Sequence, residues 1–284
     1  MPSYLAVYDR LKDHLHTSFI GKRVMSYKCV KSTQDIAISL AEREKDNVHG
    51  LVVIAESQKK GRGRHGKEWI SPYGGIWLSI VIFQPKIQAN CISLLPLVTA
   101  LVVRDTIDEG TGLNAKLKWP NDVVINEKKV SGILLDAATE QERILYVIIG
   151  IGLNANIDIT KDKTISTFDS IDMTSLKNEL SGRSVDRKKF TQLLLEKFEM
   201  EYLEFERVDT DVTVTKLKKR LDTLGNWVVV NHLDEVFSGL AIDIDRTGCL
   251  VVKHHDNFIK KVSSENASIR KASCRLKSEK SWFC

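Results

Sequence analysis

A short basic segment between Glu56 and Lys67 carries the residue types in this sequence best suited to binding chemistry. Five Lys or Arg residues and three glycines alternate there, and no acidic residue occurs from Ser57 to Lys67. Glycine reaches backbone conformations closed to other residues, so main-chain N–H groups and the guanidinium groups of Arg62 and Arg64 can converge on one anion. The segment predicts a phosphate or carboxylate site, and the alternative is a solvated basic loop.

A second polar cluster follows at Lys118-Trp119-Pro120-Asn121-Asp122. Pro120 restricts the backbone of this turn, which holds the neighbouring polar side chains in place. Lys118 could meet a ligand carboxylate or phosphate, and Asp122 could orient Lys118 or bind Mg²⁺. The alternative is an ordinary turn that carries a surface ion pair.

Two later segments place glycines inside predicted strands. Lys129 precedes Gly132, and a glycine inside a strand marks either the close approach of a ligand or a bulge. The pattern Gly150-x-Gly152-x-Asn154 looks like half of a dinucleotide-binding fingerprint. It lacks the third glycine and the following helix, which excludes a Rossmann site.

The composition indicates a globular protein. With 284 residues, 43% of them hydrophobic, the chain can form one large domain or a large and a small one. A net charge of +5 does not require a polyanionic partner. Five scattered cysteines without CxxC spacing indicate neither disulfides nor zinc. We find no secretion signal and expect no apolar stretch near the roughly 18 residues of a membrane span, so we predict a cytoplasmic protein.

The predicted helices lie within the first 222 residues. Ser32 and Asp35 form a capping box, which opens a helix. Residues 170–222 also read as helical, with a break at Gly182. The buried stripe of this region is expected to contain Phe190, Leu193, Leu194, Phe198 and Leu203. The other predicted helices are Tyr4–Leu15, Thr33–Lys45 and Ile92–Glu109, the last ending at Gly110.

The predicted strands are short runs of apolar and β-branched residues. Asn126-Glu127 suits a hairpin turn between two of them. Strands and helices do not alternate regularly, which favours an α+β fold with the helices on one face of the sheet. The expected strands are Val24–Cys29, Leu51–Ala55, Ile76–Phe83, Lys116–Trp119, Val123–Asn126, Val130–Asp136 and Ile144–Ile151.

The pattern changes near residue 222. From Trp227 onward, short strands alternate with turns about every ten residues, which predicts a small β-barrel. We therefore divide the chain into a first domain of residues 1–222 that carries the motifs, a barrel of residues 223–272, and a tail of residues 273–284. The tail has no periodic pattern, and we expect it to be disordered.

Taken in order, the motifs closely resemble those of the biotin protein ligases. GRGRxG and KWPND at this spacing are far more specific together than either is alone. The resemblance covers residues 24–156 and extends to about residue 270. It implies a mixed sheet with flanking helices, of the class II aminoacyl-tRNA synthetase and biotin ligase type, plus an SH3-like C-terminal β-barrel. The matching residues are Ser32-Thr33, Gln58-x-x-Gly61-Arg62-Gly63-Arg64-x-Gly66, Trp69, Lys118-Trp119-Pro120-Asn121-Asp122, Lys129-x-x-Gly132 and Gly150-x-Gly152-x-Asn154.

The resemblance implies an enzyme that activates biotin with MgATP to biotinyl-5′-AMP. The enzyme then transfers the biotinyl group to a lysine of a biotin carboxyl carrier protein. A carboxylate that attacks a phosphate brings two anions together, so the site needs convergent cations. The implied catalytic residues are Arg62, Arg64, Lys118, Asp122 and Lys129, with Mg²⁺ bound to the ATP phosphates near Asp122.

The resemblance also divides the ligand contacts into two groups. Residues 58–68 are expected to form a lid that orders over the reactive adenylate and excludes water. The implied biotin-binding residues are Ser32, Thr33, Gln58, Gly61, Arg62, Lys118 and Gly132. The implied nucleotide-binding residues are Arg64, Trp69, Asn121, Lys129 and Asn154.

This sequence departs from the family pattern at two positions and lacks one domain. Gln34 stands where Asn is usual, and Asp136 stands where Glu is common. About 23 residues precede the first expected strand, too few for a helix-turn-helix domain, so we predict no operator binding. The sequence leaves open whether the chain forms a homodimer.

Two other functions remain as alternatives. A lipoate or octanoate ligase or transferase would have a related fold, but the GRGRxG and KWPND pair argues against it. A nucleic-acid-binding module is the second alternative, because eight Lys or Arg residues face three acidic residues between Lys253 and Cys284. The barrel lacks an obvious run of stacking aromatics, which argues against that function.

Overall fold

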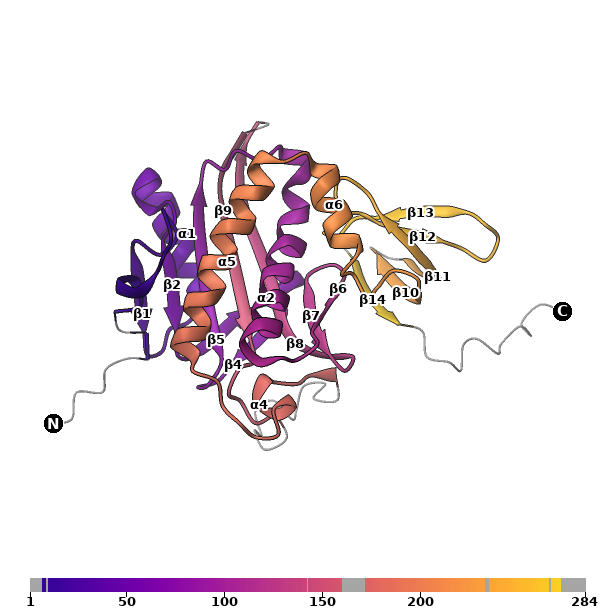
Figure 1. The fold of residues 1–284 in the computed structure, drawn as a ribbon. Coiled ribbons are helices and arrows are strands. Elements are labelled where there is room, and N and C mark those ends of the chain that lie inside the picture. The colour runs from indigo at the N-terminus through magenta and orange to yellow at the C-terminus, as the bar shows by residue number, and fades with distance from the viewer. Residues whose placement is uncertain are drawn as a thin grey trace.

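The computed structural model describes residues 7–8, 10–141, 143–159, 172–232, 235–265 and 267–271. These residues form a seven-stranded sheet, a five-stranded sheet and a two-stranded hairpin, with helices packed on the larger sheet (Figure 1). The predicted tail of residues 273–284 lies outside the described residues. The first three residues of the predicted helix Tyr4–Leu15 also lie outside them. Within the described part, a short 3-10 helix, η1 (Leu11–His14), replaces the predicted N-terminal helix.

The larger sheet is mixed, as predicted. Its strand order is β1-β2-β5-β9-β8-β7-β6, in which β1 and β2 are parallel and the other neighbours are antiparallel. The Asn126-Glu127 turn joins β7 to β8, and both residues have positive φ, as a tight hairpin turn requires. The strands are β1 (Val24–Tyr27), β2 (Val52–Ala55), β5 (Ile76–Phe83), β6 (Lys116–Lys118), β7 (Asp122–Ile125), β8 (Lys128–Glu140) and β9 (Arg143–Leu153).

Helices cover both faces of this sheet, so the prediction of helices on one face is wrong. Helices α2 (Leu95–Thr111) and α5 (Arg187–Arg207) cover one face, and α1 (Thr33–Glu44) packs on β2, β5 and β9 from the other (Figure 1). Strand β5 shows the reason, because it is apolar on both faces. Ile80 and its alternate neighbours join the main core, while Val81 packs under α1.

Helix α2 differs from its prediction in two ways. It ends two residues later than expected, at Thr111, because Gly112, with φ 74°, caps it, whereas Gly110 lies inside the helix. With the preceding 3-10 helix η4 (Ala89–Leu94) it forms an apolar segment, Ala89–Thr111, long enough to cross a membrane, contrary to the sequence expectation. Two-thirds of its most apolar window, 67%, is buried inside the protein, so it is the core helix.

The helical region after residue 172 contains α4 (Leu176–Glu179), α5 and α6 (Thr210–Lys218). The predicted stripe on α5 is correct at three positions, but Leu193 and Leu203 are only half-buried. The aromatic residues Tyr202 and Phe205 take part in the core instead. The fully packed face of α5 is formed by Phe190, Leu194, Leu195, Phe198, Tyr202 and Phe205.

The basic glycine segment forms a hairpin rather than an open loop. Strands β3 (Gln58–Arg62) and β4 (Glu68–Ser71) pair around a 3-10 turn, η3 (Arg64–Gly66). At the turn His65 and Gly66 both have positive φ, which is strained at the histidine but relaxed at the glycine. This hairpin lies next to the start of α1 and carries the predicted lid residues.

The C-terminal region forms a five-stranded antiparallel sheet in the order β13-β12-β11-β10-β14, which agrees with the predicted small barrel. Its interior residues, such as Val228 and Leu250, belong to the same apolar cluster as the core of the larger sheet. The barrel is therefore packed firmly on the first domain. Its strands are β10 (Trp227–His232), β11 (Glu235–Ile244), β12 (Leu250–Lys253), β13 (Ile259–Val262) and β14 (Ala267–Lys271).

Candidate active site

The predicted site residues meet on the face of the larger sheet that α1 covers only in part. Lys118 pairs with Asp122 across two strands, Asp122 pairs with Gly132, and Gly132 pairs with Gly152. Residues in direct register are neighbours on one face of a sheet. Motifs that are far apart in the sequence therefore form one row across β6, β7, β8 and β9.

The row contains glycines where larger side chains would not fit, because Trp69 and Lys129 lie directly over Gly152 and Gly132. A Cβ atom at Gly152 would lie 2.6 Å from Trp69 Nε1, and one at Gly132 would lie 3.0 Å from Lys129 Cε. Lys129 Nζ in turn lies 4.9 Å from the centroid of the Trp69 ring, in a cation–π contact. The strand glycines thus serve close approach. Gly132 itself pairs in register, and the irregularity of this segment lies two residues earlier, at Val130.

One end of the site is built around the start of α1. We call it the α1 end, formed by Ser32, Thr33, Gln58 and Arg62. Ser32 caps the helix by accepting the Asp35 N–H at 3.4 Å. The Gln58 amide oxygen accepts the Thr33 N–H at 2.8 Å, which brings the hairpin onto the helix N-terminus. Ser32 and Thr33 are 1% and 3% exposed, so the start of the helix is nearly closed to solvent, whereas Arg62 is exposed.

Arg62 lies between two carboxylates at this end. Its Nη1 is 3.3 Å from Asp35 Oδ1, and its Nη2 is 3.1 Å from Asp136 Oδ1. The preceding Gly61 allows β3 to approach β4, because a Cβ atom there would lie 2.3 Å from the Trp69 carbonyl oxygen. The guanidinium is therefore held over the sheet rather than left free in solvent.

The other end of the site faces the barrel. We call it the barrel end, formed by Arg64, Asn121, Asp122 and Lys129. Asp122 Oδ1 and Lys129 Nζ form an ion pair at 2.6 Å, although their angles fall outside those of a hydrogen bond. Asn121 donates to the Ile133 carbonyl at 2.6 Å and accepts from Arg64 Nη1 at 3.0 Å. Each charged group at this end has a polar partner.

Arg64 connects the hairpin to the barrel. Its Nη2 donates to the carbonyl oxygens of Ser264 and Ala267, which precede and begin β14. Burial lowers the pKa of the Arg64 guanidinium, and Asp122 opposes that shift. The group nevertheless stays charged, because an arginine does not lose its proton in proteins. The tip of the hairpin is thus fastened to residues about 200 positions later in the chain.

Lys118 and Trp119 are adjacent in the sequence but serve different parts of the molecule. Lys118 is half-exposed and has no ion pair within the described residues. Trp119 is 1% exposed, and its indole N–H donates to the Gly248 carbonyl at 2.9 Å. The KWPND motif therefore presents its lysine to the site and inserts its tryptophan under the barrel.

Two buried polar atoms near the row have no partner among the described residues. These are the amide oxygen of Asn154 and the indole nitrogen of Trp69. The Asn154 amide nitrogen is fixed by donation to the Thr174 carbonyl at 3.0 Å, so its oxygen is the free atom. Buried polar groups almost always have partners, which indicates that a ligand completes this part of the site.

Sequence reasoning missed the roles of Gln34, Ser71, Ser79 and Asp136. Gln34 Nε2 donates to Asp136 Oδ2 at 2.9 Å, and Gln34 Oε1 accepts from Ser79 Oγ at 2.8 Å. Ser71 Oγ accepts from Gln58 Nε2 at 2.8 Å. The only signal for Ser79 was a polar residue inside the apolar run Ile76–Phe83.

The described residues contain no group of three or more His, Cys, Asp or Glu side chains that could hold a metal. Asp122 is the one carboxylate of the barrel end, and it is already paired with Lys129. Mg²⁺ typically keeps several waters and is bound through one or two carboxylates plus substrate phosphates. The described residues thus do not form a metal site of their own, and Asp122 is the carboxylate that would contact Mg²⁺ arriving with a nucleotide.

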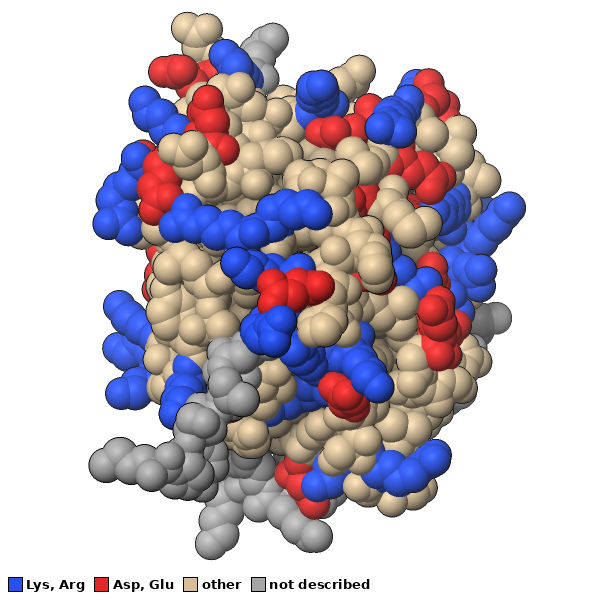
Figure 2. All heavy atoms as spheres, turned by 60° about the vertical axis from the view of Figure 1, so that its left-hand side comes forward, with Lys and Arg blue, Asp and Glu red and all other residues tan. Residues whose placement is uncertain are grey.

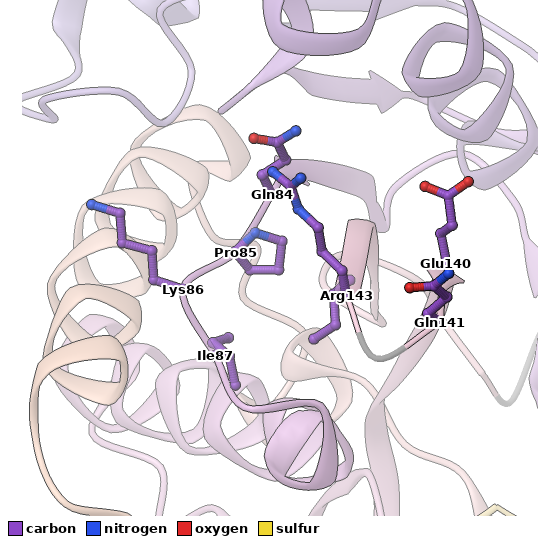
Figure 3. A pocket seen from close by; sticks show the side chains of 8 residues that line it. Gln84, Pro85, Lys86, Ile87, Glu140, Gln141 and Arg143 are labelled. Atoms are coloured by element: carbon purple, nitrogen blue, oxygen red, sulfur yellow. The ribbon is translucent and has the colours of Figure 1, made fainter.

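A separate hollow of about 640 Å³ lies at the other end of the strands. Its lining residues come from the chain after β5 and from the β8–β9 hairpin, such as Lys86 and Arg143 (Figure 3). Strand β5 runs from the row, where Trp77 pairs with Gly152, to Phe83 next to this hollow. The hollow therefore contains none of the predicted site residues.

Comparisons with known proteins agree with this geometry. Residues 26–154 match the biotin/lipoate A/B protein ligase family. The bifunctional ligase/repressor BirA of Bacillus subtilis is 31% identical over 258 residues, which cover 90% of this chain and 76% of that protein. The biotin--[acetyl-CoA-carboxylase] ligase of Paracoccus denitrificans is 29% identical over 203 residues, covering 71% and 83% of the two chains.

A solved structure shows the same fold. The biotin protein ligase of Aquifex aeolicus, in complex with biotin and ATP, is 28% identical, with a TM-score of 0.74. The match covers 88% of this chain and 100% of that one. The prediction of a biotin ligase-like domain with a C-terminal barrel is confirmed. The chain therefore belongs to the biotin/lipoate A/B protein ligase family.

Proposed function

We propose that this protein is a biotin protein ligase that forms biotinyl-5′-AMP from biotin and MgATP and transfers the biotinyl group to a carrier-protein lysine. The observation that carries this proposal is the row of Lys118, Asp122, Gly132 and Gly152, with an arginine of the basic hairpin at each end. Three separate motifs thereby supply cations to one strip of the sheet. That arrangement suits the reaction of one anion with another.

In the first step a biotin carboxylate oxygen attacks the α-phosphorus of ATP. The bond from that phosphorus to the bridging oxygen breaks, and pyrophosphate leaves with the electron pair. Lys118 has no ion pair among the described residues, so it is the cation best placed to follow the charge as it develops. Arg62, Arg64 and Lys129 offset the remaining repulsion, and Mg²⁺ held with ATP would neutralise charge on the departing pyrophosphate.

In the second step the amine of a carrier lysine attacks the acyl carbon of the adenylate. The acyl–oxygen bond breaks, AMP leaves, and the amine loses a proton. Asp122 holds Lys129 at 2.6 Å, and we assign it the role of orienting these cations and the incoming lysine. The acceptor is a biotin carboxyl carrier protein of a biotin-dependent carboxylase.

We assign the biotin ring to the α1 end. Ser32, Thr33 and Gln58 offer hydroxyl and amide groups to the ureido ring, while Gly61, Arg62, Lys118 and Gly132 line the path of its acid chain. The nucleotide then lies against Arg64, Trp69, Asn121, Lys129 and Asn154. The partnerless atoms of Asn154 and Trp69 support this placement, since adenine and ribose provide donors and acceptors.

The β3–β4 hairpin is proposed as the lid. Thr33 is 3% exposed and Gln58 of the hairpin covers it, so biotin enters only if residues 58–68 move. Limited proteolysis with and without biotin and MgATP tests this, and the ligands should protect the hairpin. Equal cleavage in both samples would contradict the lid.

The contacts at the barrel end suggest different roles for the two domains. We propose that residues 1–222 carry the chemistry and that residues 223–272 hold the hairpin tip through Arg64. A cytoplasmic location, the absence of operator binding and a possible homodimer stay predictions. A mobility shift of promoter DNA at physiological salt would contradict the second of these.

Specific observations favour the proposed function over the two alternatives. A lipoate ligase of the same family would need an apolar pocket for a dithiolane ring, whereas the α1 end presents buried polar groups. A nucleic-acid-binding surface would need a continuous basic area. On the face that Figure 2 shows, Lys and Arg side chains are interleaved with Asp and Glu.

Isotope exchange between pyrophosphate and ATP tests the proposed function. We expect exchange that requires biotin and is not supported by lipoate. Mass spectrometry of a carrier domain incubated with biotin, MgATP and the protein should then show the added mass of one biotinyl group. A carrier of unchanged mass would refute the proposal.

A further inference from the structure

A path of hydrogen bonds runs through the α1 end, and strand β3 carries both its first and its last residue. We call this path, completed by the backbone of β3, the ring. From Arg62 it passes to Asp136, to Gln34, to Ser79 and to Thr33, and then reaches Gln58, which lies on β3 with Arg62. Thr33 and Gln58 are proposed ligand contacts, whereas Gln34 and Ser79 are buried behind them. The ring therefore connects the proposed biotin contacts to residues that no ligand reaches.

The amide of Gln34 has only one possible orientation in this ring. One of its terminal atoms lies 2.9 Å from Asp136 Oδ2 and 3.1 Å from the Ile148 carbonyl oxygen. Both of these groups accept hydrogen bonds, so the atom facing them is the NH₂ group. The amide oxygen of Gln34 must then face Ser79, and the Ser79 hydroxyl must donate to it, at 2.8 Å.

This orientation fixes the direction of the next hydrogen bond. Ser79 has one hydroxyl proton, which it gives to Gln34, so at the 2.9 Å contact with Thr33 it can only accept. The single hydroxyl proton of Thr33 then goes to one of two acceptors, Ser79 Oγ or the Gln58 amide oxygen at 3.1 Å. The Gln58 oxygen also accepts the Thr33 backbone N–H at 2.8 Å. Thr33 Oγ1 is left with a lone pair and no free proton.

We propose that Gln34, anchored by Asp136, is a positioning residue. By accepting the Ser79 proton it keeps a Thr33 lone pair free, and that lone pair selects a ligand ring with an N–H donor. This inference rests on the proposed function, since the ureido ring of biotin carries such donors. The chain is built to admit Gln34, because a Cβ atom at Gly150 would lie 2.6 Å from the Gln34 amide oxygen. A ring without an N–H would leave the Thr33 lone pair buried and unpaired, which costs affinity.

The first test compares two ligands on one variant. In Gln34→Met the side chain keeps its length, but Ser79 loses its acceptor and can donate to Thr33. We expect calorimetric affinity for biotin to fall about 10- to 30-fold. Affinity for biotin methylated at a ureido nitrogen, tested at each nitrogen in turn, should change less than about threefold for the analogue that lacks the N–H facing Thr33.

The second test exchanges the lengths of the two anchoring side chains. Gln34→Asn shortens one side chain by a methylene, and Asp136→Glu lengthens the other, so only the double variant keeps the combined reach. We expect the KM for biotin in pyrophosphate exchange to rise about 10-fold in each single variant and to return to within about threefold of wild type in the double variant. The KM for ATP should stay unchanged in all three.

Tyr146→Phe is the matched control. It deletes a hydrogen bond from β9 to Glu42 at the opposite end of α1, and it should leave the KM for biotin unchanged. Unaltered biotin affinity in Gln34→Met would overturn the inference, as would a double variant whose loss equals the sum of the single losses. A wild-type protein that binds no biotin would instead refute the proposed function, so the two failures are distinguishable.

Discussion

The two ends of the site are held in different ways. At the α1 end, neutral hydroxyl and amide groups of one domain bond to one another in a fixed direction. At the barrel end, charged side chains bond to each other and to backbone carbonyls of the second domain. The α1 end is thus specified by hydrogen-bond direction and length, whereas the barrel end depends on charge and on how the domains are docked.

This difference has an energetic consequence. A hydrogen bond between the neutral groups of the ring contributes about 1 kcal/mol, and much of the selectivity comes from the cost of leaving a buried atom unpaired. A cluster of charged groups is sensitive to desolvation and to the removal of a counter-charge. Changes at the α1 end should therefore alter which acid is bound, and changes at the barrel end should alter how ATP is used.

The largest effect is expected at Lys118, which lies between the two ends. In the proposed mechanism Lys118→Met removes the cation that follows the developing charge, so the kcat/KM for pyrophosphate exchange should fall about 100- to 1,000-fold. Lys116→Met is the matched control on the same strand and face, because Lys116 is paired with Asp222 at 2.9 Å, away from the row. Equal losses in both variants would mean that the charge of β6, rather than the position of Lys118, matters.

The next largest effect separates the two ends directly. Arg64→Ala deletes contacts to Asn121, Ser264 and Ala267 and leaves the hairpin tip unfastened. We expect the KM for ATP to rise about 10- to 100-fold, since hydrogen bonds to charged groups contribute about 1.5–3 kcal/mol. Biotin affinity measured without ATP should change less than about twofold. An equal loss of biotin affinity would show that the two ends are not independent.

A change outside both ends should alter stability alone. The Glu199 carboxylate accepts backbone N–H groups of Ser18, Phe19 and Ile20, and Glu199→Gln should lower the free energy of unfolding by about 2–3 kcal/mol in urea titrations. Neither KM should change. A shift in either KM would contradict the assignment of this contact to stability.

The pH dependence of the Glu199 contribution has a definite sign. Burial raises the pKa of Glu199, but the hydrogen bonds from Ser18, Ile20 and Phe19 outweigh it and hold the pKa below its usual range. A lowered pKa in the folded state stabilises the protein above the unfolded pKa, and the contribution is lost as pH falls through the folded pKa. The difference between wild type and Glu199→Gln should therefore be full near pH 7 and shrink in acid.

The smallest effect tests how barrel docking reaches the nucleotide. Trp119→Phe keeps most of the buried ring but leaves the Gly248 carbonyl without its donor. We expect the free energy of unfolding to fall by about 1–2 kcal/mol, and the KM for ATP to rise about threefold. An unchanged KM for ATP with the expected loss of stability would confine Trp119 to a structural role.

Much of the fold was predictable because local patterns agreed with the tertiary structure. The Ser32 N-cap, the Asn126-Glu127 turn and the apolar strands formed where expected, although Asp35 pairs with Arg62. The end of α2 was wrong because two glycines lie near it, and only the one with a left-handed backbone ends the helix. The helix on the second face was missed because a strand that is buried on both faces does not show which helix covers it.

The sequence alone determined which residue types are present and their order along the chain. The glycines, the paired arginines and the KWPND motif specify a site for anions, since few other functions need that combination. These patterns are local, and local geometry follows from backbone preferences that a sequence displays directly.

Only the tertiary structure decided which groups bond to one another. Gln34 meets Asp136 across 102 residues, Trp119 meets Gly248 across 129, and Arg64 meets Ser264 across 200. Such contacts depend on strand register and domain docking, which no local pattern encodes. The sequence therefore supplied the chemistry of the site, and folding supplied the direction of its hydrogen bonds and the closure of its barrel end.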